Sequence, residues 1–292
     1  MKRVFTGKAY GKINLHLDVL DRMENGYHNI ESVMQSVSLC DTVTLELEDI
    51  SGKCEIIIKS SSQAVPCNKT NLVYKCAKKL IDYTGTTGKR CTFTIEKNIP
   101  VSAGMAGGSS DGACAMKLLN EALGGLLSHS QLCALGATVG ADIPFCLTGG
   151  TCICRGIGDK ITPIKSFGNI RLISAIDYSS VSTPVAFSLL DDKYGTDCAS
   201  SRDISKIVDA IEAEDVGNVA SLLYNKFEDV IIPINQNVEK IKRIMLENGA
   251  VGTLMSGSGP SVFGVFLDGN SQNKALSALE NCSINAFFCK TL

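Results

Sequence analysis

The feature that most constrains this chain is a glycine-rich segment, Lys97 to Ala113, which reads KNIPVSAGMAGGSSDGA. An apolar run typical of a strand, Cys91 to Ile95, precedes it, and a run with helical spacing, Ala113 to Leu123, follows it. Glycine lets backbone N–H groups approach an anion closely, and the free N–H groups of a helix N-terminus point toward it. The segment therefore predicts a strand, a phosphate-binding loop and a helix in succession, and a protein that handles a nucleoside triphosphate.

Two common phosphate-binding patterns are excluded for this loop. No Gly-Lys-Ser/Thr ends it, so it is not a Walker A loop, and Gly104, Gly107 and Gly108 do not have the dinucleotide-binding spacing G-x-G-x-x-G. A flexible linker or a tight strand-to-helix turn is the structural alternative. A linker does not normally sit between two strongly patterned apolar elements, so phosphate binding is favoured.

Composition limits the class of protein. The 292 residues suffice for one large domain or two modest ones, and 45% hydrophobic with 20% charged residues is ordinary for a globular chain. A net charge of −2 argues against a general nucleic-acid binder. No run reaches the roughly 18 apolar residues that span a bilayer, and the N-terminus has no signal-peptide pattern, so we expect a cytoplasmic protein with no membrane or nucleic-acid partner.

Thirteen cysteines suggest disulfides or a metal site, but their spacing does not. They form no C-x-x-C pair, and the three histidines (His16, His28 and His129) are far apart, so no zinc site is expected. Cys152 and Cys154 would share one face of a strand. We expect the cysteines to act as small buried hydrophobes in a reducing cytosol, among them Cys76, Cys114, Cys133 and Cys146.

The hydrophobic periodicity predicts an α+β fold with two lobes, residues 1–157 and residues 158–292. The first lobe is β-rich and holds the glycine loop with its following helices. Expected strands cover 9–20, 42–47, 55–59 and 91–95, a strand and a turn are expected in 150–159, and expected helices cover 71–83, 113–123 and 130–139. In the second lobe we expect a strand at 170–177, two helices in 203–229 broken near Gly217, a helix at 235–248, a strand–loop–strand unit at 253–266, a helix at 271–280 and a last strand.

Lys12 lies in a strand otherwise built for burial. Alternation places Lys12, Asn14 and His16 on one face, and a solvent-exposed polar face is the simplest interpretation. The functional alternative is a lysine near a transferred phosphoryl group, where its charge offsets charge that develops in the transition state.

Asp142 lies in the sequence GADIPF, just after a predicted helix. It is either the N-cap of the next helical turn or a carboxylate that accepts a hydroxyl proton. Residue type alone leaves both possibilities open.

Two further segments are candidates for ligand binding. Tyr27 and His28 follow an Asn-Gly turn signal, where an aromatic ring either packs on the core or stacks on a base whose edge the imidazole reads. Ser256 to Pro260, SGSGP, is a second glycine loop, either an ordinary hairpin loop or another anion-binding loop.

Three segments stand in the order found in the GHMP kinase superfamily, and the chain resembles that family. They are AYGKINLHL, PVSAGMAGGSSDGA and LMSGSGPSVFG. The segments NGYHNIESVMQSVSLCDTV, GADIPF and VSTPVAF are similar to the branch of the superfamily that acts on a CDP-linked methylerythritol. The resemblance runs from about residue 6 to about residue 267.

The resemblance implies an ATP-dependent kinase that phosphorylates a hydroxyl of a CDP-linked methylerythritol in the non-mevalonate isoprenoid pathway. It implies two α+β lobes with the active site between them. Asp142 matches the family's base and Lys12 matches its charge stabiliser. Mg²⁺ is expected with ATP, held mostly by phosphate oxygens and water, and no side chain is assigned to it.

The resemblance also implies binding roles for individual residues. Asn71 and Lys97 match positions that line the adenosine, and Asn14 matches a residue near the polyol. The remaining substrate residues are the cytosine-sandwiching Tyr27 and Phe187, His28 at the base edge, and Thr183. The residues that wrap the triphosphate are Pro100, Val101, Ser102, Ala103, Gly104, Met105, Ala106, Gly107, Gly108, Ser109 and Ser110.

The chain departs from the family pattern at a few positions. Tyr10 and Gly11 stand where Pro-Ala is frequent, and Ser102 and Ala106 stand where many members have glycine. Two alternative functions remain: another GHMP kinase, for homoserine, mevalonate or galactose, and a non-catalytic binding protein on the same fold. The first would lack the aromatic cytosine site, and the second could lose Lys12 or Asp142.

Overall fold

The computed structural model describes residues 2–176, 181–195 and 202–292, so Asp177, the last residue of one predicted strand, and Cys198 lie outside the described residues. Helices and strands are mixed along the chain, as expected for an α+β fold. The chain divides into two compact units. Unit 1 contains the chain up to Gly11, Cys40–Val101 and Ala106–Thr148, and unit 2 contains Lys12–Leu39, Ser102–Met105 and Gly149–Leu292. Each unit is assembled from separated stretches, and the lobe boundary at residues 157 and 158 stays a prediction.

Two long strands contribute to both units: β1 (Lys2–Arg22) and β2 (His28–Asp49). A tight turn joins them. Gly26 has φ 85°, which glycine adopts without strain, and the Met23 N–H donates to the Tyr27 carbonyl at 2.7 Å. This confirms the turn predicted from the Asn-Gly pair.

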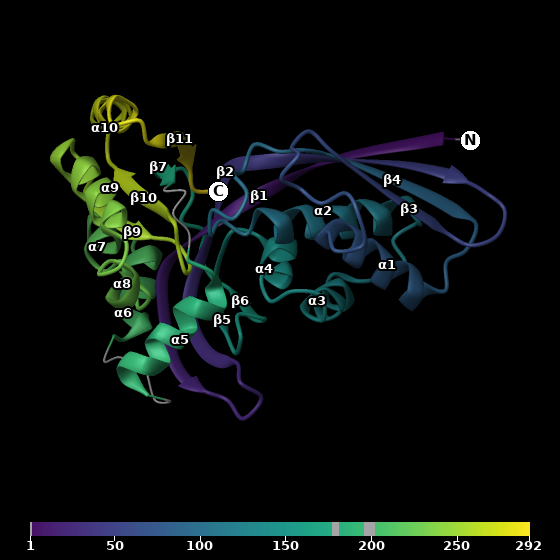
Figure 1. Cartoon of the computed structure of the whole chain (residues 1–292), viewed down its shortest axis with the longest axis horizontal. Coiled ribbons are helices and arrows are strands. Elements are labelled where there is room, and N and C mark those ends of the chain that lie inside the picture. Colours follow the sequence, from purple (N-terminus) through teal and green to yellow (C-terminus); the bar gives the residue numbers. More distant parts are fainter. Residues whose placement is uncertain (1, 177–180, 196–201) are drawn as a thin grey trace. The chain divides into compact units, whose positions relative to one another are not determined.

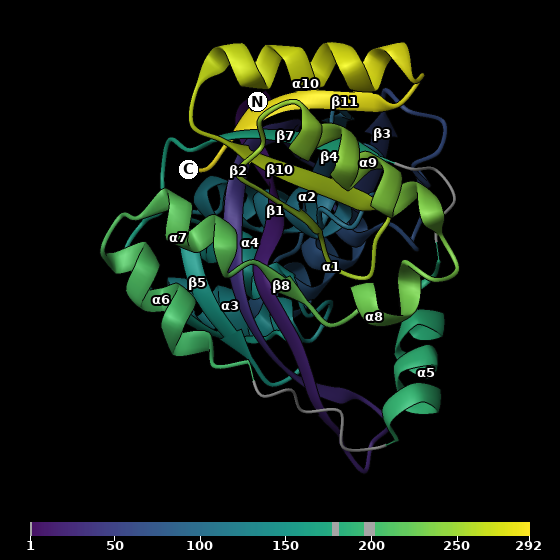
Figure 2. The same ribbon diagram turned by 90° about the vertical axis from the view of Figure 1, so that its left-hand side faces the viewer.

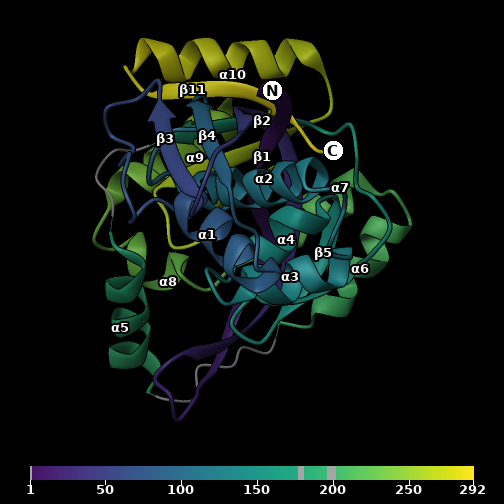
Figure 3. The same ribbon diagram turned by 90° about the vertical axis from the view of Figure 1, so that its right-hand side faces the viewer.

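In unit 1 the sheet carries helices on one face (Figures 1 and 3). β4 pairs antiparallel with β2 and parallel with β3. Alternate residues of these strands are fully buried against α1 and α2 in a single apolar core. The elements of the unit are β3 (Glu55–Ser60), β4 (Lys89–Glu96), α1 (Leu72–Thr84), α2 (Gly107–Ala122), α3 (His129–Ala137) and α4 (Ile143–Thr148).

Helix boundaries in unit 1 follow capping chemistry, with one difference from expectation. Asn71 caps α1, Gly85 ends it with φ 67°, and Ser128 caps α3 in a capping box. The prediction that the helix after the loop begins at 113 was wrong, because α2 begins at Gly107, inside the glycine run. A Cβ at Gly107 would lie 3.1 Å from Ile99, so close packing calls for glycine there despite its low helix propensity.

Unit 2 contains a four-stranded antiparallel sheet in the order β11–β7–β10–β9. Every residue of β10 is buried, because α9 and α10 pack on the sheet (Figure 2). The elements are β7 (Arg171–Ile176), β9 (Gly252–Met255), β10 (Ser261–Phe266), β11 (Asn285–Lys290), α9 (Gln236–Glu247) and α10 (Gly269–Asn281).

The rest of unit 2 builds on β1 and β2. β5 (Thr151–Arg155) pairs with β2 and with β6 (Lys160–Pro163), and β8 (Tyr224–Asn225) pairs parallel with β1. The other helices are α5 (Thr183–Tyr194), α6 (Ile204–Glu212), α7 (Val216–Ser221) and α8 (Glu228–Ile231).

The helix break predicted near Gly217 lies a few residues earlier in the structure. Gly217 lies inside α7, and the break falls at 213–215. Glu214 has φ 57°, and the Asp215 carboxylate caps α7 by accepting the Asn218 N–H at 3.0 Å. A local cap therefore decided the boundary rather than the glycine.

Candidate active site

The glycine loop presents backbone groups rather than side chains. Ser102, Gly104 and Ala106 have φ of 60°, 71° and 55°, so every second residue here is left-handed. No side chain caps the N-terminus of α2, whereas side chains cap α1 and α3. The first N–H groups of α2 are therefore available to an anion, as the phosphate-loop interpretation requires.

The second glycine loop packs directly on the first within unit 2. A Cβ at Gly104 would lie 2.7 Å from the Ser256 carbonyl oxygen and 2.9 Å from that of Gly259, so only glycine fits there. The neighbouring side chains of Ala103 and Met105 are buried. The loop is thus anchored by its own apolar side chains, which leaves its main chain as the surface for a ligand.

Lys97 and Asn71 use their side chains within unit 1. The Lys97 ammonium pairs with Asp41 and with Asp111 at 2.9 Å, and its side chain is 6% exposed. Asn71 accepts the Val73 N–H at 2.8 Å and donates to the Pro66 carbonyl at 2.7 Å. Their roles at the adenosine stay predictions, because both side chains already have structural partners.

Asp41 and Asp111 were not singled out by the sequence. The second oxygen of Asp41 accepts the N–H groups of Asn98 and Ile99 at 2.6 and 2.8 Å. Burial raises the pKa of Asp111 to about 7, against the opposing effect of Lys97, and its Oδ1 has no hydrogen-bond partner among the described residues. The cluster links the strand end at Lys97 to the first turns of α2.

Ser110, predicted to contact the triphosphate, has a buried side chain. Its hydroxyl donates to the Tyr10 carbonyl at 2.5 Å and lies 3.3 Å from the Cys146 sulfur. The bond ties the first turns of α2 to β1 within unit 1. Ser109, the preceding residue, is half-buried, and Ser102 and Gly108 are exposed.

Asp142 immediately precedes α4 and is half-buried. Its carbonyl accepts the Cys146 N–H at 3.0 Å. Within the described parts of the chain its carboxylate takes no hydrogen bond or ion pair, so the capping alternative has no bond to support it. The carboxylate remains free to accept a proton, which keeps the base assignment as a prediction.

Lys12 is buried, so the expected solvent-exposed face was wrong: Lys12 is 5% exposed and Asn14 1%. The Lys12 Nζ donates to the Asn14 Oδ1 at 2.8 Å, and the same oxygen accepts the Gly257 N–H at 3.1 Å. The Asn14 amide donates to the Ser32 hydroxyl at 2.8 Å. Alternation along the strand was right, but the second glycine loop covers the polar face.

His16 continues the same face and is also buried. Burial lowers the pKa of His16, which favours the neutral imidazole. The ring packs against Tyr224 with centroids 5.4 Å apart, and its Nε2 has no hydrogen-bond partner in the described residues. Nothing connects its side chain to the candidate chemistry.

An aromatic cluster surrounds His28. Its ring stacks on Phe187 at 4.6 Å and 15°, and Phe187 meets Phe227 edge-on at 5.0 Å. The Asp191 carboxylate lies 2.7 Å from the His28 Nε2, so Nδ1 is the ring nitrogen left without a hydrogen bond among the described residues. The structure thus brings His28 and Phe187 together, and their roles at a cytosine stay predictions.

Tyr27 and Thr183 also lie in unit 2. The Tyr27 ring is 61% exposed, so it does not pack on a core, and the Thr183 hydroxyl lies 2.9 Å from the Ser258 hydroxyl of the second glycine loop. Asp191 was missed by sequence reasoning. The available signal was its position four residues after Phe187, which places both on one face of a helix.

The twelve cysteines in the described part of the chain are free. Burial raises the pKa of four thiols to about 12, so these are unreactive at neutral pH. Their role as small buried hydrophobes is confirmed for Cys76, Cys91, Cys114, Cys152, Cys154 and Cys289. Cys133 and Cys146, which we expected to be buried, are only half-buried, and Cys67 and Cys282 are exposed.

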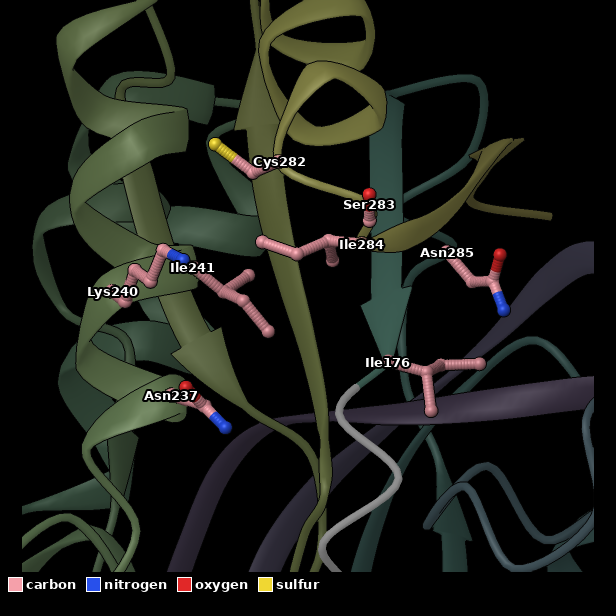
Figure 4. Close-up of a pocket in the computed structure, with 8 residues that line it drawn as sticks. All are labelled: Ile176, Asn237, Lys240, Ile241, Cys282, Ser283, Ile284 and Asn285. Carbon is pink, nitrogen blue, oxygen red and sulfur yellow. The ribbon is translucent and has the colours of Figure 1, made fainter.

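A cavity of about 240 Å³ in unit 2 contains none of the predicted site residues (Figure 4). In Figure 4, Asn237, Lys240 and Ile241 come from α9, and Cys282 to Asn285 come from the segment that leads from α10 into β11. Its lining mixes apolar and amide side chains with a single charge, and offers no acid–base pair. The lining residues are Ile176, Asn237, Lys240, Ile241, Cys282, Ser283, Ile284 and Asn285.

Two family models match the sequence. The GHMP kinases N terminal domain matches residues 71–150 and the GHMP kinases C terminal domain matches residues 207–285. The first match includes the glycine loop and Asp142, and the second includes the SGSGP loop. Among the described residues no helix is long and apolar enough to cross a membrane.

Curated relatives extend the likeness over almost the whole chain. A 4-diphosphocytidyl-2-C-methyl-D-erythritol kinase of Caldicellulosiruptor bescii is 41% identical, over 95% of this chain and 93% of the relative. A kinase of the same name from Lachnospira eligens is 40% identical, over 90% of this chain and 89% of the relative.

Solved structures agree. A 4-(cytidine 5'-diphospho)-2C-methyl-D-erythritol kinase superposes with a TM-score of 0.80 at 26% identity, over 98% of this chain and 99% of that chain. The Methanococcus jannaschii mevalonate kinase superposes with a TM-score of 0.74 at 16% identity, over 100% of this chain and 99% of that chain, which shows a shared fold only.

Proposed function

Because the chain belongs to the 4-diphosphocytidyl-2-C-methyl-D-erythritol kinase family of GHMP kinases, we propose that it transfers the γ-phosphoryl group of ATP to the 2-hydroxyl of 4-diphosphocytidyl-2-C-methyl-D-erythritol. The step belongs to the non-mevalonate route to isoprenoid precursors. The cluster of His28, Phe187 and Asp191 is the observation that carries the choice of acceptor, since mevalonate kinases share the fold without having a base to bind.

The cytosine site follows from that cluster. Asp191 fixes the His28 ring through Nε2, which leaves Nδ1 to hydrogen-bond the edge of a base. We propose that Tyr27 and Phe187 supply the stacking surfaces. An exposed ring such as Tyr27 loses water when it stacks on a planar base, which favours binding. Thr183 is the proposed neighbour along the same acceptor site.

For the chemical step, we propose Asp142 as the group that accepts the hydroxyl proton and Lys12 as the group that stabilises the transferring phosphoryl. A carboxylate without hydrogen bonds has all its lone pairs available for a proton. The Lys12 ammonium has a neutral amide as its partner in unit 2, so its charge is not cancelled there. Asn14 is proposed to accept a hydrogen bond from that ammonium with its Oδ1, and to donate the remaining N–H of its amide to the polyol.

For ATP, we propose that the backbone of residues 100–110 and the uncapped start of α2 hold the triphosphate. The left-handed residues turn successive N–H groups, and the helix dipole favours negative charge at this end. Asn71 and Lys97 are proposed to line the adenosine from positions already fixed by their structural partners.

We propose that Mg²⁺ enters with ATP as part of the substrate and neutralises phosphate charge. Within the described residues no three His, Cys, Asp or Glu side chains converge on one point. The proposed ion is held mostly by phosphate oxygens and water, as is usual for Mg²⁺ in sites that bind ATP.

Both proposed substrates are highly charged small molecules. We therefore propose that the protein works in the cytoplasm, with metabolites rather than nucleic acid or a membrane as its partners. The net charge of −2 supports this, because a nucleic-acid surface needs an excess of cations.

The test is turnover of purified protein with ATP and Mg²⁺, with and without the cytidyl acceptor, and with homoserine, mevalonate or galactose instead. We expect ADP release only with the cytidyl acceptor, together with a new phosphomonoester on its polyol. Free CMP or CDP should compete with that acceptor.

Each other outcome has a definite meaning. ADP release with one of the other alcohols would retain the kinase and refute the cytosine site. Release with none of them would favour a non-catalytic binding protein on the same fold.

A further inference from the structure

Asn225 lies at the end of β8, and all the hydrogen bonds described for its side chain are to backbone groups. Its amide donates to the carbonyls of Met255 and Gly257 at 2.6 and 2.8 Å, and its oxygen accepts the Phe227 N–H at 3.0 Å. The residue is 2% exposed. An asparagine amide has two donor hydrogens, so both are spent on the segment that opens the second glycine loop.

That segment is also held from a second direction. Glu228 accepts the Met255 N–H at 2.8 Å, while its other oxygen pairs with Lys242. Met255 is therefore fixed at its N–H by Glu228 and at its carbonyl by Asn225. A buried residue whose N–H and carbonyl are both held in this way has little freedom to rotate about its backbone.

The pinned segment ends at the candidate lysine. The Gly257 carbonyl faces Asn225, and the Gly257 N–H donates to the Asn14 Oδ1, which also accepts the Lys12 ammonium. A Cβ at Gly257 would lie 3.7 Å from the Lys12 Nζ, so the loop backbone runs beside the ammonium. A continuous set of contacts inside unit 2 thus leads from Asn225 through Gly257 and Asn14 to Lys12.

We propose that Asn225 is a positioning residue for phosphoryl transfer, which sets the direction of the Lys12 ammonium through Gly257 and Asn14. The proposal rests on the proposed function. Electrostatic stabilisation of a transition state depends on a charge being placed in advance, and a misplacement of about 1 Å can cost roughly 100-fold in rate. Asn225 touches neither substrate in this role.

The first test compares Asn225→Ala with Asn120→Ala. Asn120 is a matched control in unit 1, since its amide also bonds a distant backbone residue, at the N–H and the carbonyl of Leu127. We expect Asn225→Ala to lower kcat by roughly 10- to 100-fold with the KM for ATP nearly unchanged. Asn120→Ala should lose comparable stability and keep its kcat. Equal loss of kcat in both variants would overturn the proposal.

The second test is a double-mutant cycle with Asn14. In the Asn14→Ala background the connection to Lys12 is already broken, so Asn225→Ala should lower kcat little further. If Asn225 has only a structural role, the fold-losses of kcat from Asn14→Ala and Asn225→Ala should multiply in the double variant. This result would refute the proposal. Asn225→Ser, which keeps one donor, should recover part of the kcat and guards against failure of the alanine variant to fold.

A third measurement does not depend on the acceptor. Trace acetylation followed by mass spectrometry reports the reactivity of the Lys12 amine, which should change in Asn225→Ala and stay as in the wild type in Asn120→Ala. If the wild type fails to phosphorylate the cytidyl acceptor, the proposed function falls while this comparison still tests the positioning. Unchanged Lys12 reactivity in Asn225→Ala would overturn the positioning itself.

Discussion

Lys12 in unit 2 and Lys97 in unit 1 are equally hidden from solvent but have opposite surroundings. Lys97 pairs with two carboxylates, Asp41 and Asp111, whereas Lys12 donates to the neutral amide oxygen of Asn14 and pairs with no carboxylate among the described residues of its own unit. A buried ammonium matched by carboxylates is neutralised and holds structure together. A buried ammonium whose partner is a neutral dipole is not matched by a negative charge, so it is suited to interact with an anionic substrate.

The substitution that tests the contrast between the two lysines most strongly is Lys12→Met. We expect kcat to fall by about 10³-fold or more, because a charge that stabilises a transferring phosphoryl group is lost. The free energy of unfolding should hardly change, since Asn14 keeps its bond to Gly257. Steady-state kinetics and urea unfolding measure both quantities. Lys8→Met, an exposed lysine on the same strand, is the control, and a similar kcat for the two variants would end the distinction.

Asp142→Asn tests the candidate base of unit 1, whose carboxylate has no partner among the described residues. Turnover should fall by roughly 10²- to 10⁴-fold, because an amide cannot accept the proton, while ATP binding by calorimetry should stay nearly unchanged. Asp82→Asn, which alters an exposed helix ion pair, is the control. Near-normal turnover of Asp142→Asn would exclude it as the base.

Lys97→Met should act on stability instead. Removing the ammonium leaves two buried carboxylates side by side, which typically costs about 3–5 kcal/mol. Guanidine unfolding measures the loss. Lys78→Met, which removes an exposed ion pair, is the control and should hardly change the free energy of unfolding. If Lys97→Met unfolds like the wild type, the charge cluster does not stabilise unit 1.

Asp111→Asn should show a pH dependence with a defined sign. The pKa of Asp111 is raised from 3.8 to about 7 in the folded protein, so the wild type loses stability as the pH rises through this range. The variant lacks this loss, and its stability relative to the wild type should increase from about pH 4 to pH 7 and then level off. Urea unfolding over that range measures it. A difference independent of pH would contradict the raised pKa.

Ala106→Gly is the smallest expected effect. Ala106 has φ 55°, and a non-glycine residue in the left-handed region costs about 1–2 kcal/mol, partly offset by the greater freedom of glycine in the unfolded chain. We expect the free energy of unfolding, measured by thermal unfolding, to increase by about 0.5–1 kcal/mol. Ala113→Gly, inside α2, should be destabilising instead, and a loss at both positions would remove the argument for strain at the start of the helix.

The two lysines also show what the sequence can and cannot predict. Lys12 was recognisable as a candidate from its local segment, yet its burial was not, because the covering loop at Gly257 lies far along the chain. The partner of Lys97 at Asp41 is 56 positions away and carries no local signal. Strands and helices with clear periodicity, such as α1 and α9, were predicted within a residue or two.

Where prediction failed, contacts distant in sequence decided the outcome. α2 begins at Gly107, where a Cβ would lie 3.1 Å from the Ile99 side chain, and no propensity scale contains such a packing contact. His28 was identified from its turn, but its partner Asp191 lies 163 positions away. The sequence therefore predicts which residue types form the candidate site, but it does not predict which distant residues orient those side chains.

The burial of the cysteines has a practical consequence for spectroscopy. A thiol with a pKa of about 12 is a thiolate in roughly one molecule in 10⁵ at neutral pH, so the deeply buried cysteines should ignore maleimide dyes. Of the described cysteines, Cys67 in unit 1 and Cys282 in unit 2 are the exposed ones. A variant that keeps Cys67 and Cys282 and replaces the half-buried cysteines and Cys198 would carry one attachment point in each unit, so energy transfer could test whether nucleotide alters the distance between them.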